Sequence, residues 1–128
     1  MRPKEILQKW VELFNHYDFE GLAELYAEDC INHQTPNGIV RGKENIKQMF
    51  KQEFEQFEMI CIVENIFEDG NVGMLEWKDP KGLRGCGFFW IENDSKSITN
   101  LMRCICTSYT MYFNKKYDRV GPLFQSNY

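Results

Sequence analysis

One histidine and one glutamate are the residues best suited to acid–base chemistry in this sequence. His33 lies in the stretch "YAEDCINHQTPNGIVRGKENI", and its imidazole would suit a general base or acid at neutral pH. Glu76, in "VGMLEWKD", is its candidate partner, because a carboxylate buried among aromatic rings is favoured in its neutral form. The alternative for His33 is a pocket-lining or partly exposed strand residue without a catalytic role.

The side chains beside these two residues limit the chemistry further. Glu76 and Trp77 alternate on one predicted strand, so only one of them faces the interior, and Trp77 is the more ordinary inward residue. Cys30 and His33 are three residues apart on an extended stretch, so their side chains point to opposite faces. We therefore discount a thiol nucleophile.

Composition and charge exclude several classes of function. Residues 1–100 carry 11 basic and 18 acidic side chains, whereas residues 101–128 carry 4 basic and 1 acidic. The acidic body argues against nucleic-acid binding, which needs clustered positive charge. No apolar run is long enough for a membrane span, and the N-terminus does not resemble a secretory signal.

The five cysteines predict free thiols rather than a disulfide framework or a metal site. Their number is odd, and with only two histidines in the chain the Cys104–Cys106 spacing gives zinc little support. We expect no metal and no cofactor, and a reducing cytoplasmic location.

The elements that would position these residues change type along the chain. Apolar spacing predicts helices over residues 3–17, 19–27 and 43–56, with short strands at 30–35 and 39–42 between the second and third. From residue 58 a period of two predicts long strands at 58–68, 72–79, 83–92 and 97–109. Helices followed by antiparallel strands indicate an α+β fold with the helices on one face of the sheet.

Three segments of this order resemble the SnoaL-like branch of the nuclear transport factor 2-like superfamily. They are "W…FN…DFEGLAELYAEDC", "VRGKENIKQMF" and "CGFFWIEN", and together they span roughly residues 5–100, taken as one domain of residues 1–100. The resemblance implies a cone-shaped curved sheet around an aromatic-lined pocket. The residues expected to line it are Trp10, Phe14, Tyr26, Gln34, Phe50, Phe54, Trp77, Phe88 and Trp90.

The steroid isomerases of that superfamily supply a test of the chemistry. Where they carry a tyrosine, a catalytic base and a second acid, this sequence has Trp10, Gln34 and the neighbourhood of Gly87. Gln34 cannot take up a proton at neutral pH, so their mechanism does not transfer.

Residues 101–128 form an atypical C-terminal strand and tail, either part of the same domain or a fused arm. "YTMYFNKKYDRVGPLFQSNY" is similar to a segment of transposases associated with repetitive extragenic palindromes. Those enzymes use an H-x-H metal site, which this sequence lacks, so the likeness carries no nuclease prediction.

Two functions remain open at this stage. One is a module that binds a small apolar or aromatic molecule without catalysis. The other is an acid–base enzyme acting on a carbonyl-bearing small molecule, resembling cyclases, isomerases or dehydratases, through His33 and Glu76. For either one we expect a homodimer formed through the open face of the sheet.

Overall fold

The computed structural model describes residues 2–34, 38–93 and 100–112, and it has the predicted α+β organisation. The helices are α1 (Pro3–Asn15), α2 (Phe19–Glu24) and α3 (Lys43–Gln56). The strands are β1 (Ile31–Gln34), β2 (Gly38–Arg41), β3 (Ile62–Asp69), β4 (Val72–Lys78), β5 (Leu83–Asn93) and β6 (Asn100–Tyr112). Most of the expected turns at 36–38 and 93–96, and the tail from 113, lie outside the described residues.

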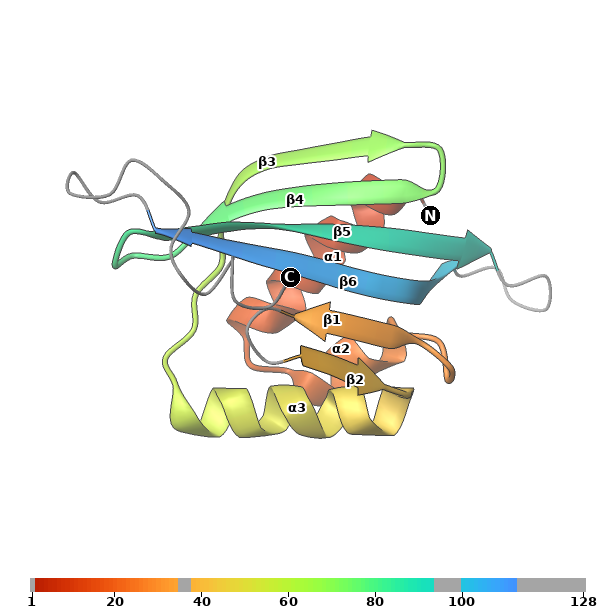
Figure 1. Ribbon diagram of the computed structural model, residues 1–128, viewed down its shortest axis with the longest axis horizontal. Helices are drawn as coiled ribbons and strands as arrows, with labels where there is room; N and C mark the ends of the chain where they lie inside the picture. The colour runs from red at the N-terminus through yellow and green to blue at the C-terminus, as the bar shows by residue number, and fades with distance from the viewer. Residues whose placement is uncertain (1, 35–37, 94–99, 113–128) are drawn as a thin grey trace.

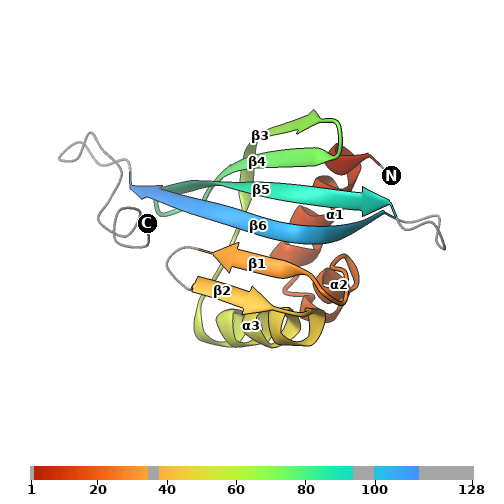
Figure 2. The ribbon, with the colours of Figure 1, turned by 45° about the vertical axis from the view of Figure 1, so that its right-hand side comes forward.

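The six strands form one sheet in the order β2-β1-β6-β5-β4-β3. All neighbouring pairs are antiparallel except β1 and β6, which run parallel and join the short N-terminal strands to the long C-terminal ones. The helices lie on one side of this sheet, with α1 crossing behind the long strands and α3 beside β1 and β2 (Figures 1 and 2). The core therefore lies between the helices and one face of the sheet, which we call the inner face.

Helix α1 is held close to the sheet because its apolar face meets a glycine on β4. Ile6, Leu7, Trp10 and Phe14 are buried at the three-and-four spacing of one helical face. A Cβ on Gly73 would lie 2.7 Å from Cδ1 of Leu7, so any larger residue there would collide with the helix. Gly73 thus permits the close packing of α1 on β4.

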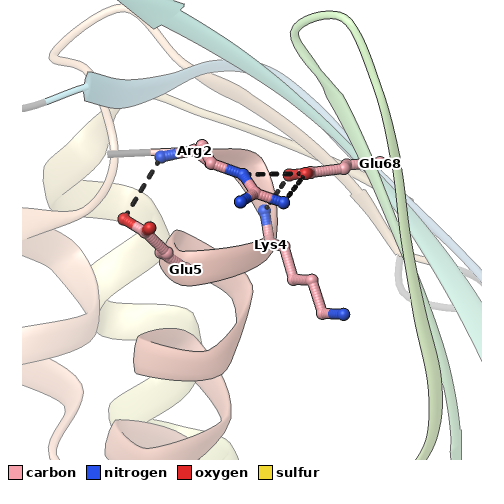
Figure 3. A network of polar contacts seen from close by, with 4 residues as sticks. All are labelled: Arg2, Lys4, Glu5 and Glu68. Carbon is pink, nitrogen blue, oxygen red and sulfur yellow. Dashed lines mark hydrogen bonds and ion pairs between the residues drawn. The ribbon is translucent and has the colours of Figure 1, made fainter.

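The first turn of α1 is capped by a side chain from β3 (Figure 3). Arg2, at the N-cap position, makes no side-chain capping bond. Glu68 supplies it instead: its Oε2 accepts from the backbone N–H of Lys4 at 3.0 Å, and its Oε1 accepts from Nε of Arg2 at 2.9 Å. A carboxylate at a helix N-terminus is stabilised by the unpaired N–H groups there. This contact joins α1 to the edge strand of the sheet.

Several predicted boundaries differ from the structure, and two of them have a clear local cause. Helix α2 ends at Glu24 rather than Ala27, because the N–H groups of Leu25 and Tyr26 bond carbonyls only three residues back, in a tightened final turn. Strand β3 begins at Ile62 rather than Glu58, because side chains of α1 and its C-terminal loop take up the preceding backbone. Asn15 binds both the N–H and the carbonyl of Cys61, at 2.8 and 3.0 Å, and the Tyr17 hydroxyl accepts from the N–H of Met59.

Candidate functional site

Aromatic rings from α1, α3 and the sheet gather around Trp10 on the inner face. Trp10 stacks on Phe14 of the same helix, with ring centroids 4.9 Å apart and an interplanar angle of 15°. Its other contacts are edge-on, to Phe89 of β5 at 5.6 Å and to Phe50 of α3 at 6.2 Å. Offset-stacked and edge-to-face arrangements are the favoured geometries for such rings. Much of the interior is therefore occupied by the protein's own aromatic side chains.

The ring cluster reaches the surface through Phe54. This half-buried ring packs edge-on against Phe14 at 5.3 Å and is stacked on Tyr17 at 4.9 Å. Tyr17 is 38% exposed and follows the end of α1 with φ of 57°. Phe54 and Tyr17 thus form the outer rim of the cluster, where a small change of ring position would open it to solvent.

Tyr26 places a polar group inside the cluster. It is 1% exposed, and its hydroxyl accepts a hydrogen bond from Nε1 of Trp10 at 3.0 Å. A buried indole N–H needs such an acceptor, since leaving it unpaired is costly. Trp10 and Tyr26, both expected from the sequence to line a pocket, thus contact each other directly in the core.

Two polar contacts connect β1 to α3 beside the rings. Nδ2 of Asn32 lies 3.5 Å from Sδ of Met49, and Nε2 of Gln34 donates to Oε1 of Glu53 at 3.1 Å. The two contacts repeat along both elements. Asn32 and Gln34 are two residues apart on the strand, Met49 and Glu53 are four apart on the helix, and these two separations cover similar lengths. Oδ1 of Asn32, itself 1% exposed, has no hydrogen-bond partner within the described part of the chain.

Glu53 is a residue that sequence reasoning missed. Its carboxylate contacts Gln34, the position where a steroid isomerase carries its base. No signal in the sequence pointed to it, because its partner lies nineteen residues away and helix spacing alone does not identify the strand that a helix faces. Together, Asn32, Gln34 and Glu53 form a polar edge to the ring cluster.

His33 lies on the other face of β1 from this polar edge. Asn32 and Gln34 point toward α3, so the alternation of a strand turns His33 outward. Its cross-strand partner is Ile39 of β2, which is 56% exposed. His33 therefore does not share a face with Trp10, Tyr26 and the other rings.

Glu76 also lies on the outer face. Its neighbours Leu75 and Trp77 belong to the core or pack against it, which places Trp77 inward as expected. Glu76 accepts from Nδ2 of Asn65 at 3.4 Å. His33 on β1 and Glu76 on β4 are separated by β6 and β5, so roughly 14 Å lie between them at the usual strand spacing. The structure does not bring the two acid–base candidates together.

Strand β5 divides its three consecutive aromatics between the faces. Phe89 is buried with Ile91 on the inner face, whereas Phe88 and Trp90 lie on the outer face and contact each other, with centroids 6.3 Å apart. Phe88 and Trp90 were expected to line a pocket, but they lie on the opposite side of the sheet from the ring cluster. Phe89 is the β5 aromatic that joins the cluster instead. Gly85 and Gly87 share the inner face with Phe89. They could have identified this face from the sequence, because glycines on a strand accompany close packing.

Neither a reactive thiol nor a metal-binding cluster adds to the site among the described side chains. Burial raises the pKa of Cys61 to about 12, and burial followed by the nearby Glu76 charge raises that of Cys86. Both thiols are thus poor nucleophiles at neutral pH. Among the described side chains of residues 2–34 and 38–92, no three metal-binding groups come together. No helix in the described part of the chain is long and apolar enough to cross a membrane.

Comparison with known proteins defines the class to which this architecture belongs. A family model described as a SnoaL-like domain matches residues 7–98, most of the chain. The chain therefore belongs to the SnoaL-like family. No curated protein sequence matches it.

Solved structures with the same fold include several of the nuclear transport factor 2 type. A SnoaL-like protein of unknown function from Burkholderia thailandensis superposes with a TM-score of 0.70 at 12% identity, over 84% of this chain and 93% of that one. An NTF-2 like protein of unknown function from Burkholderia xenovorans gives 0.67 at 16% identity, over 97% and 90%. A ketosteroid isomerase-like protein from Erwinia carotovora atroseptica gives 0.64 at 10% identity, over 87% and 95%. At these identities the likeness establishes the fold alone.

Proposed function

We propose that this protein is a non-catalytic module that binds a small, largely apolar or aromatic molecule at the ring cluster. The observation that carries this proposal is the arrangement of the inner face, where aromatic rings adjoin a polar edge of Asn32, Gln34 and Glu53. Apolar walls with a few polar groups are typical of small-molecule sites. The acid–base alternative lacks this support, because His33 and Glu76 lie on the other face of the sheet.

The ligand would enter at the rim formed by Phe54 and Tyr17. These are the outermost rings of the cluster, and Phe54 stacks on Phe50 as well as on Tyr17, so its displacement leads directly to the interior. A flat aromatic molecule would replace ring contacts with ring contacts of similar energy. A hydroxyl on that molecule would donate to Oδ1 of Asn32, which offers a buried acceptor.

Two matched probes test this proposal. Titration with 2-naphthol and with 2-methylnaphthalene, followed by NMR shifts of the aromatic side chains, is expected to show both binding, with 2-naphthol the tighter. Phe54→Ala should weaken both, whereas Phe67→Ala, an exposed ring on β3, should change neither. Absence of binding by both probes at their solubility limits would refute the module, and equal affinities would refute only the role of Asn32.

We also propose that the module forms a homodimer through the outer face of the sheet. Ile39 and His33 are cross-strand partners at one side of this face, and Phe67, Met74 and Phe88 are paired across three strands at the other. Ile39 and Phe67 are 56% and 48% exposed, and neighbouring large apolar side chains with this much exposure often mark a protein interface. The same face carries Glu76 with Lys78 and Arg84, so a two-fold axis that passes between the acidic and basic groups would pair opposite charges of the two copies.

Sedimentation measurements test the dimer. Wild type is expected to sediment as a dimer, and Ile39→Lys with Phe67→Lys should shift it toward the monomer. Phe57→Lys places the same charge on a ring that is 61% exposed but lies after α3, and it should leave the dimer intact. A monomeric wild type would exclude this interface.

The thiols support a proposal on location. Cys61 and Cys86 form no disulfide, and Cys61 is buried. Free buried thiols suit a reducing compartment, which supports the proposal that the protein acts in the cytoplasm.

A further inference from the structure

An exposed apolar patch lies where the chain passes from α3 to β3. It consists of Phe57, Ile60 and Ile62, which are 61%, 49% and 37% exposed. We call these three residues the corner patch. Exposed side chains of this size, so close together along the chain, usually mark a surface that another segment or molecule covers.

The backbone that carries the corner patch is fixed from behind. The Asn15 side chain makes two hydrogen bonds to Cys61, and the Tyr17 hydroxyl accepts from the N–H of Met59. Cys61 is buried on this inner side, so the alternation of an extended chain turns Ile60 and Ile62 outward. The backbone at the patch is thus held by three hydrogen bonds from the side chains of Asn15 and Tyr17, so an occupant would find the surface preformed.

Acidic side chains border the patch. Glu55 near the end of α3 and Glu58 directly before Met59 are both exposed. Glu64 follows Val63 and is paired with Arg84 at 2.8 Å. An occupant with apolar and basic side chains would therefore match this surface better than an acidic one.

The C-terminal segment of this same chain has that composition. Residues 113–128 lie outside the described residues and hold three basic side chains and one acidic side chain. Their large apolar and aromatic residues are Phe113, Tyr117, Val120, Leu123, Phe124 and Tyr128. The segment is thus opposite in charge to the body of the protein and rich in side chains able to cover exposed isoleucines.

The segment also starts at the end of the sheet where the corner patch lies. Tyr112, the last residue of β6, pairs with Leu83 of β5, and the neighbouring Arg84 pairs with Lys78, which pairs with Ile62. β6 therefore ends where β3 begins, as Figure 1 shows. Three strand spacings are roughly 14 Å, whereas sixteen extended residues reach up to about 50 Å.

We propose that residues 113–128 dock on the corner patch of their own chain. Their apolar side chains cover Ile60, Ile62 and their neighbours, and their basic side chains lie near Glu55 and Glu58. This inference does not depend on the ligand proposal, because the corner patch is not part of the ring cluster. Ile62 does lie beside Lys78 on the outer face, so the concentration dependence of the protection must separate tail docking from dimer formation.

Limited trypsin digestion of the full chain tests the docking. Trypsin cleaves after Lys115, Lys116 and Arg119, and intact-mass analysis resolves these cuts from cuts in the body. Ile60→Ser is expected to accelerate tail cleavage severalfold. Gln8→Ser is the control, because Gln8 is exposed on α1 and belongs to none of the proposed surfaces, and it should leave the tail rate unchanged.

Three results would overturn the proposal. The first is tail cleavage in wild type as fast as in Ile60→Ser, and the second is equal acceleration by Gln8→Ser. The third is protection that rises with protein concentration, which would make the occupant a second copy. A complementary measurement leaves the body unaltered: Leu123→Ser with Phe124→Ser should shift the δ1-methyl NMR signals of Ile60 and Ile62 but not that of Ile39, and unchanged signals would also refute docking.

Discussion

The indole N–H of Trp10 donates to the hydroxyl of Tyr26 across 3.0 Å in the buried centre of the molecule. The two residues come from α1 and from the bend that follows α2, so this one bond fixes the first helix against the start of the short strands. Both side chains also contact the ring of Phe50, at centroid distances of 6.2 and 6.1 Å. The polar bond thus sets the orientation of a cluster that is otherwise held by apolar contacts.

Tyr26→Phe should lower the free energy of unfolding by about 1–3 kcal/mol, because it leaves the indole N–H buried without its acceptor. Urea denaturation followed by circular dichroism measures the change. Tyr17→Phe is the matched control, since its hydroxyl also accepts one N–H but at an exposed position, and it should cost less. Equal losses for the two variants would show that burial of the Trp10–Tyr26 bond has no special effect.

The contact between Glu68 and the start of α1 predicts a dependence of stability on pH. The Arg2 side chain, and next the N–H of Lys4, hold the pKa of Glu68 below its usual 4.5. A carboxyl group with a lowered folded-state pKa stabilises the protein above the unfolded pKa, and this contribution is lost as pH falls through the folded value.

Glu68→Gln should therefore lower the thermal midpoint slightly at pH 7 and leave it nearly unchanged near pH 3. Both partners are solvent-accessible, so the effect at pH 7 should also diminish in high salt. Thermal melts of wild type and variant at the two pH values test this. A difference that persisted undiminished at pH 3 would contradict an electrostatic origin.

Sequence periodicity predicted the elements well where local signals agreed. Helix α3 runs over Lys43–Gln56 as expected, because its apolar period begins directly after Gly42, whose φ of 86° suits glycine at a helix entry. The start of β3 was harder to predict from the sequence, because the hydrogen bonds that hold residues 59 and 61 come from Asn15 and Tyr17, more than forty residues earlier. Such side-chain-to-backbone contacts leave no periodic signal.

The face on which each strand residue lies was the harder problem. Alternation shows that Glu76 opposes Trp77, and that Phe89 opposes Phe88, but not which member of each pair meets the helices. The packing of α1 on Gly73 decides this, because Gly73, Leu75 and Trp77 lie on one side of β4. Candidate site residues on β4 and β5 could therefore be assigned to a face only with the helix in place.

Gly73→Ala tests the close approach of α1 to the sheet. The added methyl group would meet Cδ1 of Leu7, and over-packing of this kind typically costs about 1–3 kcal/mol. Leu7→Ala removes the opposing atoms at its own cost, so the double variant should be less destabilised than the sum of the single ones. Additive losses in urea denaturation would show that the two positions do not interact.

The Asn15 side chain offers a last test, because it binds the backbone at a residue with a buried thiol. It bonds both backbone groups of Cys61, whose pKa burial raises to about 12, so the folded protein should resist alkylation at pH 8. Asn15→Ala should lower the free energy of unfolding by about 1–2 kcal/mol and speed the reaction of Cys61 with iodoacetamide, read by peptide mass spectrometry. Asn45→Ala, which removes one exposed bond to the Arg41 carbonyl, should change neither quantity. If Asn15→Ala destabilised the protein without exposing Cys61, the two hydrogen bonds would stabilise the end of α1 but would not hold the segment that leads into β3.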